Sequence, residues 1–111
     1  MKIVEEYTNW GVIFDYLCDE CSFSLHRYDV DSSTFYLSSV HVKPEFREQG
    51  IGNSILDKAE KDVIEFYKAD TLALKCHKES WMHKWYERHG YKDMCEDEWN
   101  DNFVWMYKNL K

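Results

Sequence analysis

The chain has 111 residues, 44% hydrophobic and 17% aromatic, which suits one domain with a modest core and excludes a disordered acidic chain. Its formal net charge of −7 argues against nucleic-acid binding, which needs clustered Lys and Arg, but leaves room for one local phosphate site. No apolar run approaches the roughly 18 residues of a membrane span and no signal peptide precedes residue 7, so we expect a cytoplasmic protein without membrane contact.

Alternating apolar and polar residues predict strands in the first part of the chain. These strands are expected at Lys2–Tyr7, Gly11–Leu17, Ser22–Tyr28 and Thr34–Val42. The second of them, with Trp10 at its start, would also suit a helix by its apolar spacing. Short polar segments, Cys18–Cys21 and Asp29–Ser33, separate the later strands and predict turns, so we expect an antiparallel meander.

After Pro44 the apolar period changes to that of a helix. The expected buried stripe consists of Ile55, Leu56, Ala59, Val63, Ile64 and Phe66 or Tyr67. The expected solvent face consists of Asp57, Lys58, Lys61, Asp62 and Glu65. The change of period therefore places one amphipathic helix directly after the meander.

The last part of the chain alternates between strand and helix signals. Thr71–Cys76 predicts a buried strand, and a second helix follows with Ser80 as its N-cap and Gly90 at its end. Two more strands are expected at Tyr91–Cys95 and Phe103–Tyr107. Because strand-helix-strand requires a parallel pair, we expect a single α/β domain, residues 1–111, with a mixed sheet.

The segment Arg47-Glu48-Gln49-Gly50-Ile51-Gly52 places two glycines and a cation where a strand ends and a helix begins. Glycines lack Cβ atoms, so an anion can approach this backbone, and the free amides of a helix start favour a phosphate. A Walker loop needs Gly-Lys-Ser/Thr, and a dinucleotide fold needs a third glycine where Ile55 stands. The segment therefore predicts a phosphate site of another kind.

Residues Val40–Leu56 resemble the acyl-CoA-binding segment of the GNAT superfamily of N-acyltransferases, whose motif is Arg/Gln-x-x-Gly-x-Gly/Ala. The run Trp85–Tyr91 is similar to the aromatic-Tyr-x-x-x-Gly-aromatic run of the same family. Together with the strand between them, the two blocks cover roughly residues 34–92. The resemblance implies a GNAT-like fold and acetyl-CoA as cosubstrate.

The resemblance also implies which residues meet acetyl-CoA. Those expected at the cofactor are Val40, His41 and Val42, whose backbone would hold pantetheine as an added strand would, and Arg47, Gln49, Gly50, Ile51, Gly52 and Asn53 around the pyrophosphate. In this family the tyrosine of the aromatic run commonly protonates the departing thiolate, and that position is Tyr86. The alternative for Tyr86 is an aromatic of the core, because it lies at helical spacing from Met82 and His89.

The general base stays unassigned. Tyr36 and Ser38 stand where family members often carry Glu or His, and either could hold a water that deprotonates the amine. Histidine is a residue type that can act as a base, but simple alternation places His41 on the strand face opposite those two residues. The chain also departs from the family at Glu48 and Glu79, and two N-terminal helices usual in the family have no counterpart.

We therefore expect direct transfer of an acetyl group to a primary amine. Glu96, Asp97, Glu98 and Asp101 crowd one loop that, by resemblance, borders the acceptor mouth, so a cationic acceptor such as a protein lysine or a polyamine-like molecule is expected. The alternative is an acidic, non-catalytic interaction protein on the same scaffold; homodimers are common in the family. Cys18-x-x-Cys21 has no second close Cys or His pair, so we expect no metal.

Overall fold

The structure, a computed structural model, describes residues 1–29 and 31–111; Val30, inside the predicted Asp29–Ser33 turn, lies outside the described residues. The strands are β1 (Lys2–Thr8), β2 (Gly11–Leu17), β3 (Cys21–Arg27), β4 (Thr34–Val42), β5 (Thr71–His77), β6 (Lys92–Glu96) and β7 (Phe103–Asn109). The helices are η1 (Pro44–Phe46), a short 3-10 turn, α1 (Ile51–Glu65) and α2 (Trp81–Arg88). The predicted order of strands and helices is confirmed, and Gly11–Leu17 is a strand rather than a helix.

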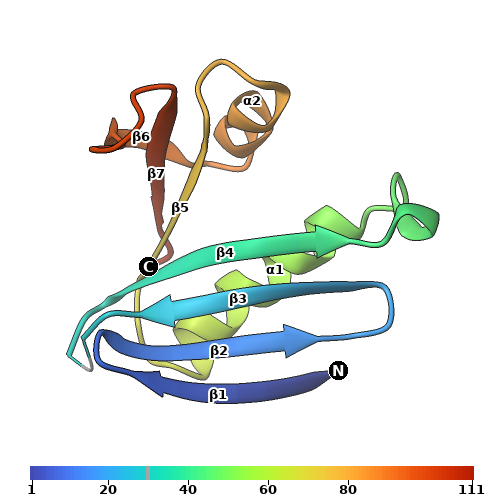
Figure 1. Ribbon diagram of the computed structural model, residues 1–111, viewed down its shortest axis with the longest axis vertical. Coiled ribbons are helices and arrows are strands. Elements are labelled where there is room, and N and C mark those ends of the chain that lie inside the picture. The colour runs from blue at the N-terminus through green and yellow to red at the C-terminus, as the bar shows by residue number, and fades with distance from the viewer. Residues whose placement is uncertain (30) are drawn as a thin grey trace.

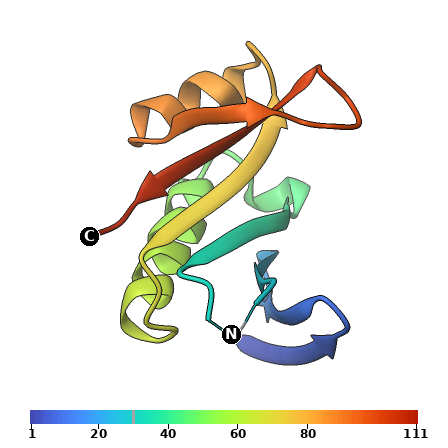
Figure 2. The same ribbon diagram turned by 90° about the vertical axis from the view of Figure 1, so that its left-hand side faces the viewer.

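The described strands form one mixed sheet with the order β1-β2-β3-β4-β5-β7-β6. Strands β1 to β4 make the predicted antiparallel meander, β4 and β5 are parallel, and β7 is antiparallel to both of its neighbours. Helices α1 and α2 lie on the same face of the sheet (Figure 2). In the part of the chain that the structure describes, neither helix is long and apolar enough to cross a membrane.

Strands β4 and β5 stay together for only a short distance. Thr34–Tyr36 pair with Thr71–Ala73, and the remaining residues of β4 have no partner on β5. Figure 1 shows β5 turning away from β4 and carrying α2, β7 and β6 with it. The gap that opens beyond Tyr36 lies next to the start of α1, because α1 follows β4 after η1.

Helix α1 covers the meander with the apolar stripe that its sequence predicts. Ile55, Leu56, Ala59 and Val63 are buried against core residues of the sheet, and each large apolar side chain buried in this way stabilises the fold by about 1.5–3 kcal/mol. Ile64 is only half-buried, and Phe66 is an exception, because the helix ends there and its side chain is 72% exposed. The alternative, Tyr67, is correct: its ring stacks on Phe14 at 4.4 Å between centroids.

Asp62 lies in the core rather than on the expected solvent face of α1, with 7% of its surface exposed. The Tyr16 hydroxyl donates a hydrogen bond to Asp62 Oδ2 at 2.5 Å, and Lys58 Nζ lies 3.2 Å from Oδ1. The hydroxyl of Tyr67 is 2.7 Å from that of Tyr16. A buried carboxylate is stable only with such partners, so this network joins the end of β2 to the last turn of α1.

His41 lies on the same face of the sheet as Ser38, and the expectation that it faces the other way is wrong. Ser22 and Ser24 share one face of β3 because their positions differ by two. Ser22 is directly opposite His41 and Ser24 is directly opposite Ser38, and opposite residues share a face. Tyr36 is directly opposite His26, which is two positions after Ser24, so Tyr36 lies on this face too. This is the face away from the helices.

A β-bulge causes this reversal. Between the two serine pairs, β3 contributes one residue and β4 contributes two, Ser39 and Val40. Ser39 has φ of 53°, which lies in the left-handed region. The extra residue moves every later side chain of β4 to the opposite face from the one that simple alternation predicts. Val42 therefore packs towards the helices, against the core.

We predict that Tyr16→Phe lowers the free energy of unfolding by about 1.5–3 kcal/mol, the usual value of a hydrogen bond to a charged group. The physical reason is that Asp62 would keep its burial and lose a donor. Urea unfolding at neutral pH measures the change. Tyr7→Phe is the matched control, because the Tyr7 hydroxyl also bonds a carboxylate, Glu5, at 3.1 Å, but the residue is 79% exposed. Equal effects of the two changes would contradict the prediction.

Candidate active site

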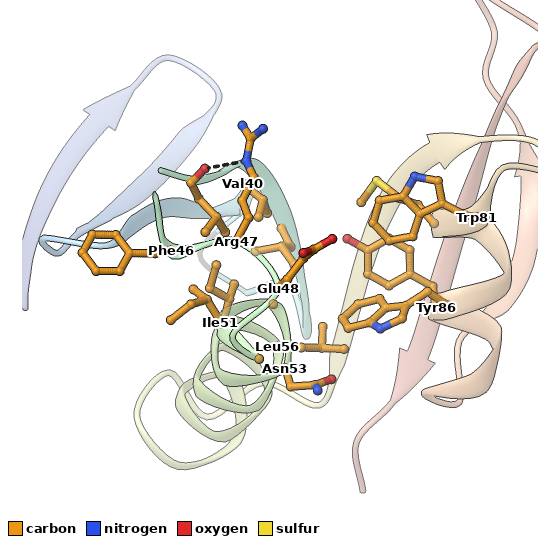
Figure 3. Close-up of a pocket in the computed structure, with 16 residues that line it drawn as sticks. Val40, Phe46, Arg47, Glu48, Ile51, Asn53, Leu56, Trp81 and Tyr86 are labelled. Carbon is orange, nitrogen blue, oxygen red and sulfur yellow. Dashed lines mark hydrogen bonds between the residues drawn. The ribbon is translucent and has the colours of Figure 1, made fainter. Parts of the chain in front are cut away.

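A cavity of about 890 Å³ opens between the end of β4, the start of α1 and the inward side of α2. Most of its walls are apolar or backbone. Its lining comprises Leu37, Val40, Val42, Phe46, Arg47, Glu48, Gly50, Ile51, Gly52, Asn53, Ile55, Leu56, Trp81, Met82, Trp85 and Tyr86. Figure 3 shows the α1 side and the α2 side facing each other across this space. The gap between β4 and β5 thus becomes a cleft deep enough for an extended ligand.

The start of α1 offers backbone donors to the cavity. Gly50 is the N-cap residue with φ of 76°, a conformation that favours glycine, and no described side chain caps this end. The first hydrogen bond of the helix runs from the Ser54 amide to the Gly50 carbonyl at 3.2 Å. The amides of Ile51–Asn53 therefore have no acceptor within the helix, and they are well placed for an anion.

Gly52 faces the α2 wall of the cavity. A Cβ atom built on Gly52 would lie 3.8 Å from ring carbon Cζ2 of Trp85, its nearest neighbour and an ordinary contact distance. A side chain at this position would therefore fit the folded protein. It would also fill part of the cavity beside the amides of Ile51–Asn53.

Two of the residues expected at the cofactor direct their side chains elsewhere. His41 is exposed on the other face of the sheet, and the Gln49 amide donates to the Glu45 carbonyl at 3.1 Å. The other expected residues, Val40, Val42, Arg47, Gly50, Ile51, Gly52, Asn53 and Tyr86, line the cavity. Arg47 Nε donates to the Val42 carbonyl at 3.2 Å, so this guanidinium braces the end of β4 in the free protein (Figure 3).

Tyr86 is buried to 6% exposure, and its hydroxyl points into the cavity towards Glu48 (Figure 3). The rings of Trp85 and Tyr91 lie edge-on at 5.1 and 5.7 Å and hold its orientation. Burial, with a smaller contribution from Cys76, raises the pKa of Tyr86 to about 12. The phenol is therefore protonated at neutral pH, and it can donate its proton to a negative charge that develops beside it.

Sequence patterns assigned no role at this site to His89 or to the aromatic wall of α2. His89 Nε2 lies 2.9 Å from Asn53 Oδ1, and its Nδ1 lies 2.8 Å from the Trp85 carbonyl. The imidazole therefore links the end of α2 to the start of α1. The spacing of four on α2 puts Trp81 and Trp85 on one side of the helix, but only the fold shows that Trp85 faces Gly52 of α1.

Metal-ligating side chains are not gathered in the described residues. No group of three or more His, Cys, Asp or Glu suited to a metal ion occurs among them. The Sγ atoms of Cys18 and Cys21 lie 2.9 Å apart at the β2–β3 turn, where Cys18 Sγ also donates to the Cys21 carbonyl. Two sulfurs are too few for a structural zinc site, which takes four ligands.

The face of the sheet away from the helices carries polar and aromatic residues beside the gap. Tyr36 packs edge-on against Trp105 at 5.7 Å between ring centroids. The Ser24 hydroxyl donates to Asp15 Oδ1 at 2.6 Å on the same face as Ser38 and His41. No helix covers this face in the described residues (Figure 2). It is therefore open to a second molecule approaching the gap from the side opposite α1.

The acidic loop between β6 and β7 is partly neutralised by lysines. Glu96 bonds Lys78 at 2.5 Å, and Asp97 lies 3.7 Å from Lys75 while accepting a hydrogen bond from the Trp105 indole at 3.1 Å. Across the described parts of the chain, Glu98 and Asp101 have no ion-pair partner. The loop thus presents two free carboxylates rather than the four that the sequence suggests.

Comparison with known proteins identifies the family of this domain. The profile described as "Acetyltransferase (GNAT) domain" matches residues 24–108, which is most of the chain. A search of curated protein sequences finds no significant match.

Solved acetyltransferases share the fold at low sequence identity. Spermidine N-acetyltransferase SpeG from Vibrio cholerae superposes with a TM-score of 0.71 at 14% identity, over 94% of this chain and 68% of that one. A GNAT acetyltransferase from Elizabethkingia anophelis with acetyl-CoA bound gives 0.69 at 15% identity, over 93% and 78%. PaiA N-acetyltransferase from Thermoplasma acidophilum in complex with coenzyme A gives 0.68 at 20% identity, over 87% and 59%.

Proposed function

The chain belongs to the GNAT acetyltransferase family, and we propose that it transfers an acetyl group from acetyl-CoA directly to a primary amine of a cationic acceptor, either a protein lysine or a polyamine-like molecule. The observation that carries this proposal is the cavity that joins the uncapped start of α1 to the buried hydroxyl of Tyr86. One end can hold phosphates and the other end can supply a proton, as a CoA thioester requires.

Backbone groups of the cavity would bind the donor, acetyl-CoA, at two places. The amides of Ile51–Asn53 would bind the pyrophosphate, since a helix start favours anions and Gly52 leaves room for close approach. Beyond Tyr36, the edge of β4 that faces β5 has no strand partner, so the backbone of Val40 and Val42 can bond the amides of pantetheine. Arg47 would have to leave the Val42 carbonyl or share it.

Tyr86 supplies the proton that the reaction needs. The amine nitrogen attacks the thioester carbonyl, the carbon–sulfur bond breaks, and the departing thiolate receives the phenolic proton of Tyr86. The amine loses its own proton to a base or to water, so charge and protons balance without a covalent enzyme intermediate. Tyr86 regains a proton from solvent, because burial holds the pKa of its phenol at about 12.

Charge and shape both favour a cationic acceptor of large size. In the described residues, Glu98 and Asp101 give the β6–β7 loop two carboxylates without an ion-pair partner, and such carboxylates attract ammonium groups over a distance. The uncovered face of the sheet suits a bulky acceptor such as a protein segment. Among the structural neighbours, the Vibrio cholerae protein is a spermidine N-acetyltransferase, and another from Escherichia coli is a ribosomal-protein-S18-alanine N-acetyltransferase.

Acetyl-CoA should raise the melting temperature of the protein, whereas NAD should not. A ligand at 100 times its Kd stabilises the native state by about 2.7 kcal/mol, and a thermal-shift series measures this. Gly52→Val should melt like the unchanged protein but lose the shift, because valine would fill the space beside the amides. Ser54→Val, an exposed position outside the cavity on the same helix turn, is the matched control. No shift with millimolar acetyl-CoA would contradict the proposal.

Tyr86→Phe should lower the turnover number about 10²-fold, the usual scale for one acid–base group, and leave acetyl-CoA affinity unchanged. Steady-state kinetics with calorimetric binding separates the two effects. Tyr91→Phe is the control, because that hydroxyl is also in a buried side chain but bonds Glu60 at 2.9 Å outside the cavity. Equal turnover in Tyr86→Phe and the unchanged protein would leave thiolate protonation to solvent.

Cationic acceptors should be preferred in a screen of lysine peptides, spermidine, aminoglycosides and neutral arylamines. Their apparent affinity should weaken as salt rises, because exposed carboxylates act through screened charge. Acetylation followed by CoA release at low and high salt measures both effects. A preference for neutral or anionic amines that is indifferent to salt would overturn the acceptor proposal and leave the donor proposal standing.

A further inference from the structure

We propose that Glu48 determines how the donor is recognised, because its carboxylate opposes the phosphates of acetyl-CoA. The site would then bind the phosphate end of the donor less tightly than the α1 amides alone would allow, and depend more on the pantetheine arm. This inference rests on the proposed use of acetyl-CoA as the donor. It concerns one residue of the loop that precedes α1.

Glu48 is the carboxylate that lies inside the cavity. It belongs to the lining, between Arg47 and the helix start at Gly50, and its side chain points across the space towards the Tyr86 hydroxyl (Figure 3). Glu45 belongs to the same loop but not to the lining. A ligand that reaches from the α1 amides to Tyr86 therefore passes Glu48.

The charge of Glu48 is not compensated within the site. Over the described residues, Glu48 takes part in no ion pair or side-chain hydrogen bond. The other charged group of the lining is Arg47, and its Nε is bonded to the Val42 carbonyl instead. The unpaired carboxylate thus works against the anion preference of the neighbouring amides.

The backbone aims this carboxylate into the cavity. Glu48 has φ of 64°, in the left-handed region that residues other than glycine seldom adopt. Its flanking residues fix this conformation, since Gln49 bonds back to the Glu45 carbonyl and α1 begins at Ile51. The direction of the Cα–Cβ bond is therefore set by the loop, and only rotation of the side chain can move the charge.

The size of the effect follows from the charges involved. Two unit charges about 4 Å apart at a protein surface repel strongly enough to change an equilibrium about tenfold or more. Acetyl-CoA carries its negative charge on phosphates, and S-acetylpantetheine has the same thioester arm without them. Removing the charge of Glu48 should therefore affect the first ligand and not the second.

The experiment compares Glu48→Gln with the unchanged protein by calorimetry, using acetyl-CoA and S-acetylpantetheine as probes at low and high salt. We expect Glu48→Gln to bind acetyl-CoA about tenfold tighter at low salt, a gain that shrinks as salt rises, and to bind S-acetylpantetheine unchanged. Glu45→Gln is the matched control, since it removes the same charge from the same loop outside the cavity, and its effect should be several-fold smaller.

The other possible results separate the role of Glu48 from the proposal that acetyl-CoA is the donor. Acetyl-CoA binding that is no tighter in Glu48→Gln would overturn the role of Glu48 alone. An equal gain for both probes would overturn it too, because the side chain would then act by bulk and not by charge. Failure of all variants to bind acetyl-CoA would overturn the donor proposal together with this inference. Binding of acetyl-CoA by Glu48→Gln but not by the unchanged protein would support both.

Discussion

The early separation of β4 from β5 is the constraint on which the rest of the structure depends. Three residue pairs hold the two parallel strands together, and after Tyr36 the strands diverge. A parallel pair that loses its ladder exposes backbone donors and acceptors, which must find other partners. In the free protein, Arg47 Nε donates a hydrogen bond to the Val42 carbonyl, and the rest of this edge of β4 faces the cavity. The cleft is thus a property of strand geometry before any side chain is considered.

The site relies on groups whose state does not depend on the acidic surface of the protein. Backbone amides at the start of α1 carry no titratable charge, and burial keeps Tyr86 protonated by raising its pKa to about 12. The net charge of −7 would disfavour a polyanion held by surface lysines. Backbone dipoles and a neutral phenol suit the phosphate and thioester chemistry that we propose for this acidic chain.

Local patterns predicted most of the fold, because periodicity and capping act over a few residues. The burial of Leu56 and Ala59, and the Ser80 side chain that accepts the His83 amide, both follow from such patterns. What failed depends on partners far along the chain. His41 changes face because β4 has one residue more than β3 opposite it, and Asp62 is buried because Tyr16 reaches it from β2. The same holds for His89, whose partner Asn53 lies on the other helix.

Because of the bulge and because both α-helices cover the same face, the two faces of the sheet differ in how freely their side chains can be replaced. Side chains such as Leu25 and Phe35 are fully buried beneath α1, so replacing them alters the packing of the whole domain. Ser38 and His41 face away from the helices and are exposed, so replacing them leaves that packing intact. Evolution or a protein engineer can therefore change side chains on the uncovered face at little cost in stability. The side chains of the same strand that pack beneath the helices are constrained by the core.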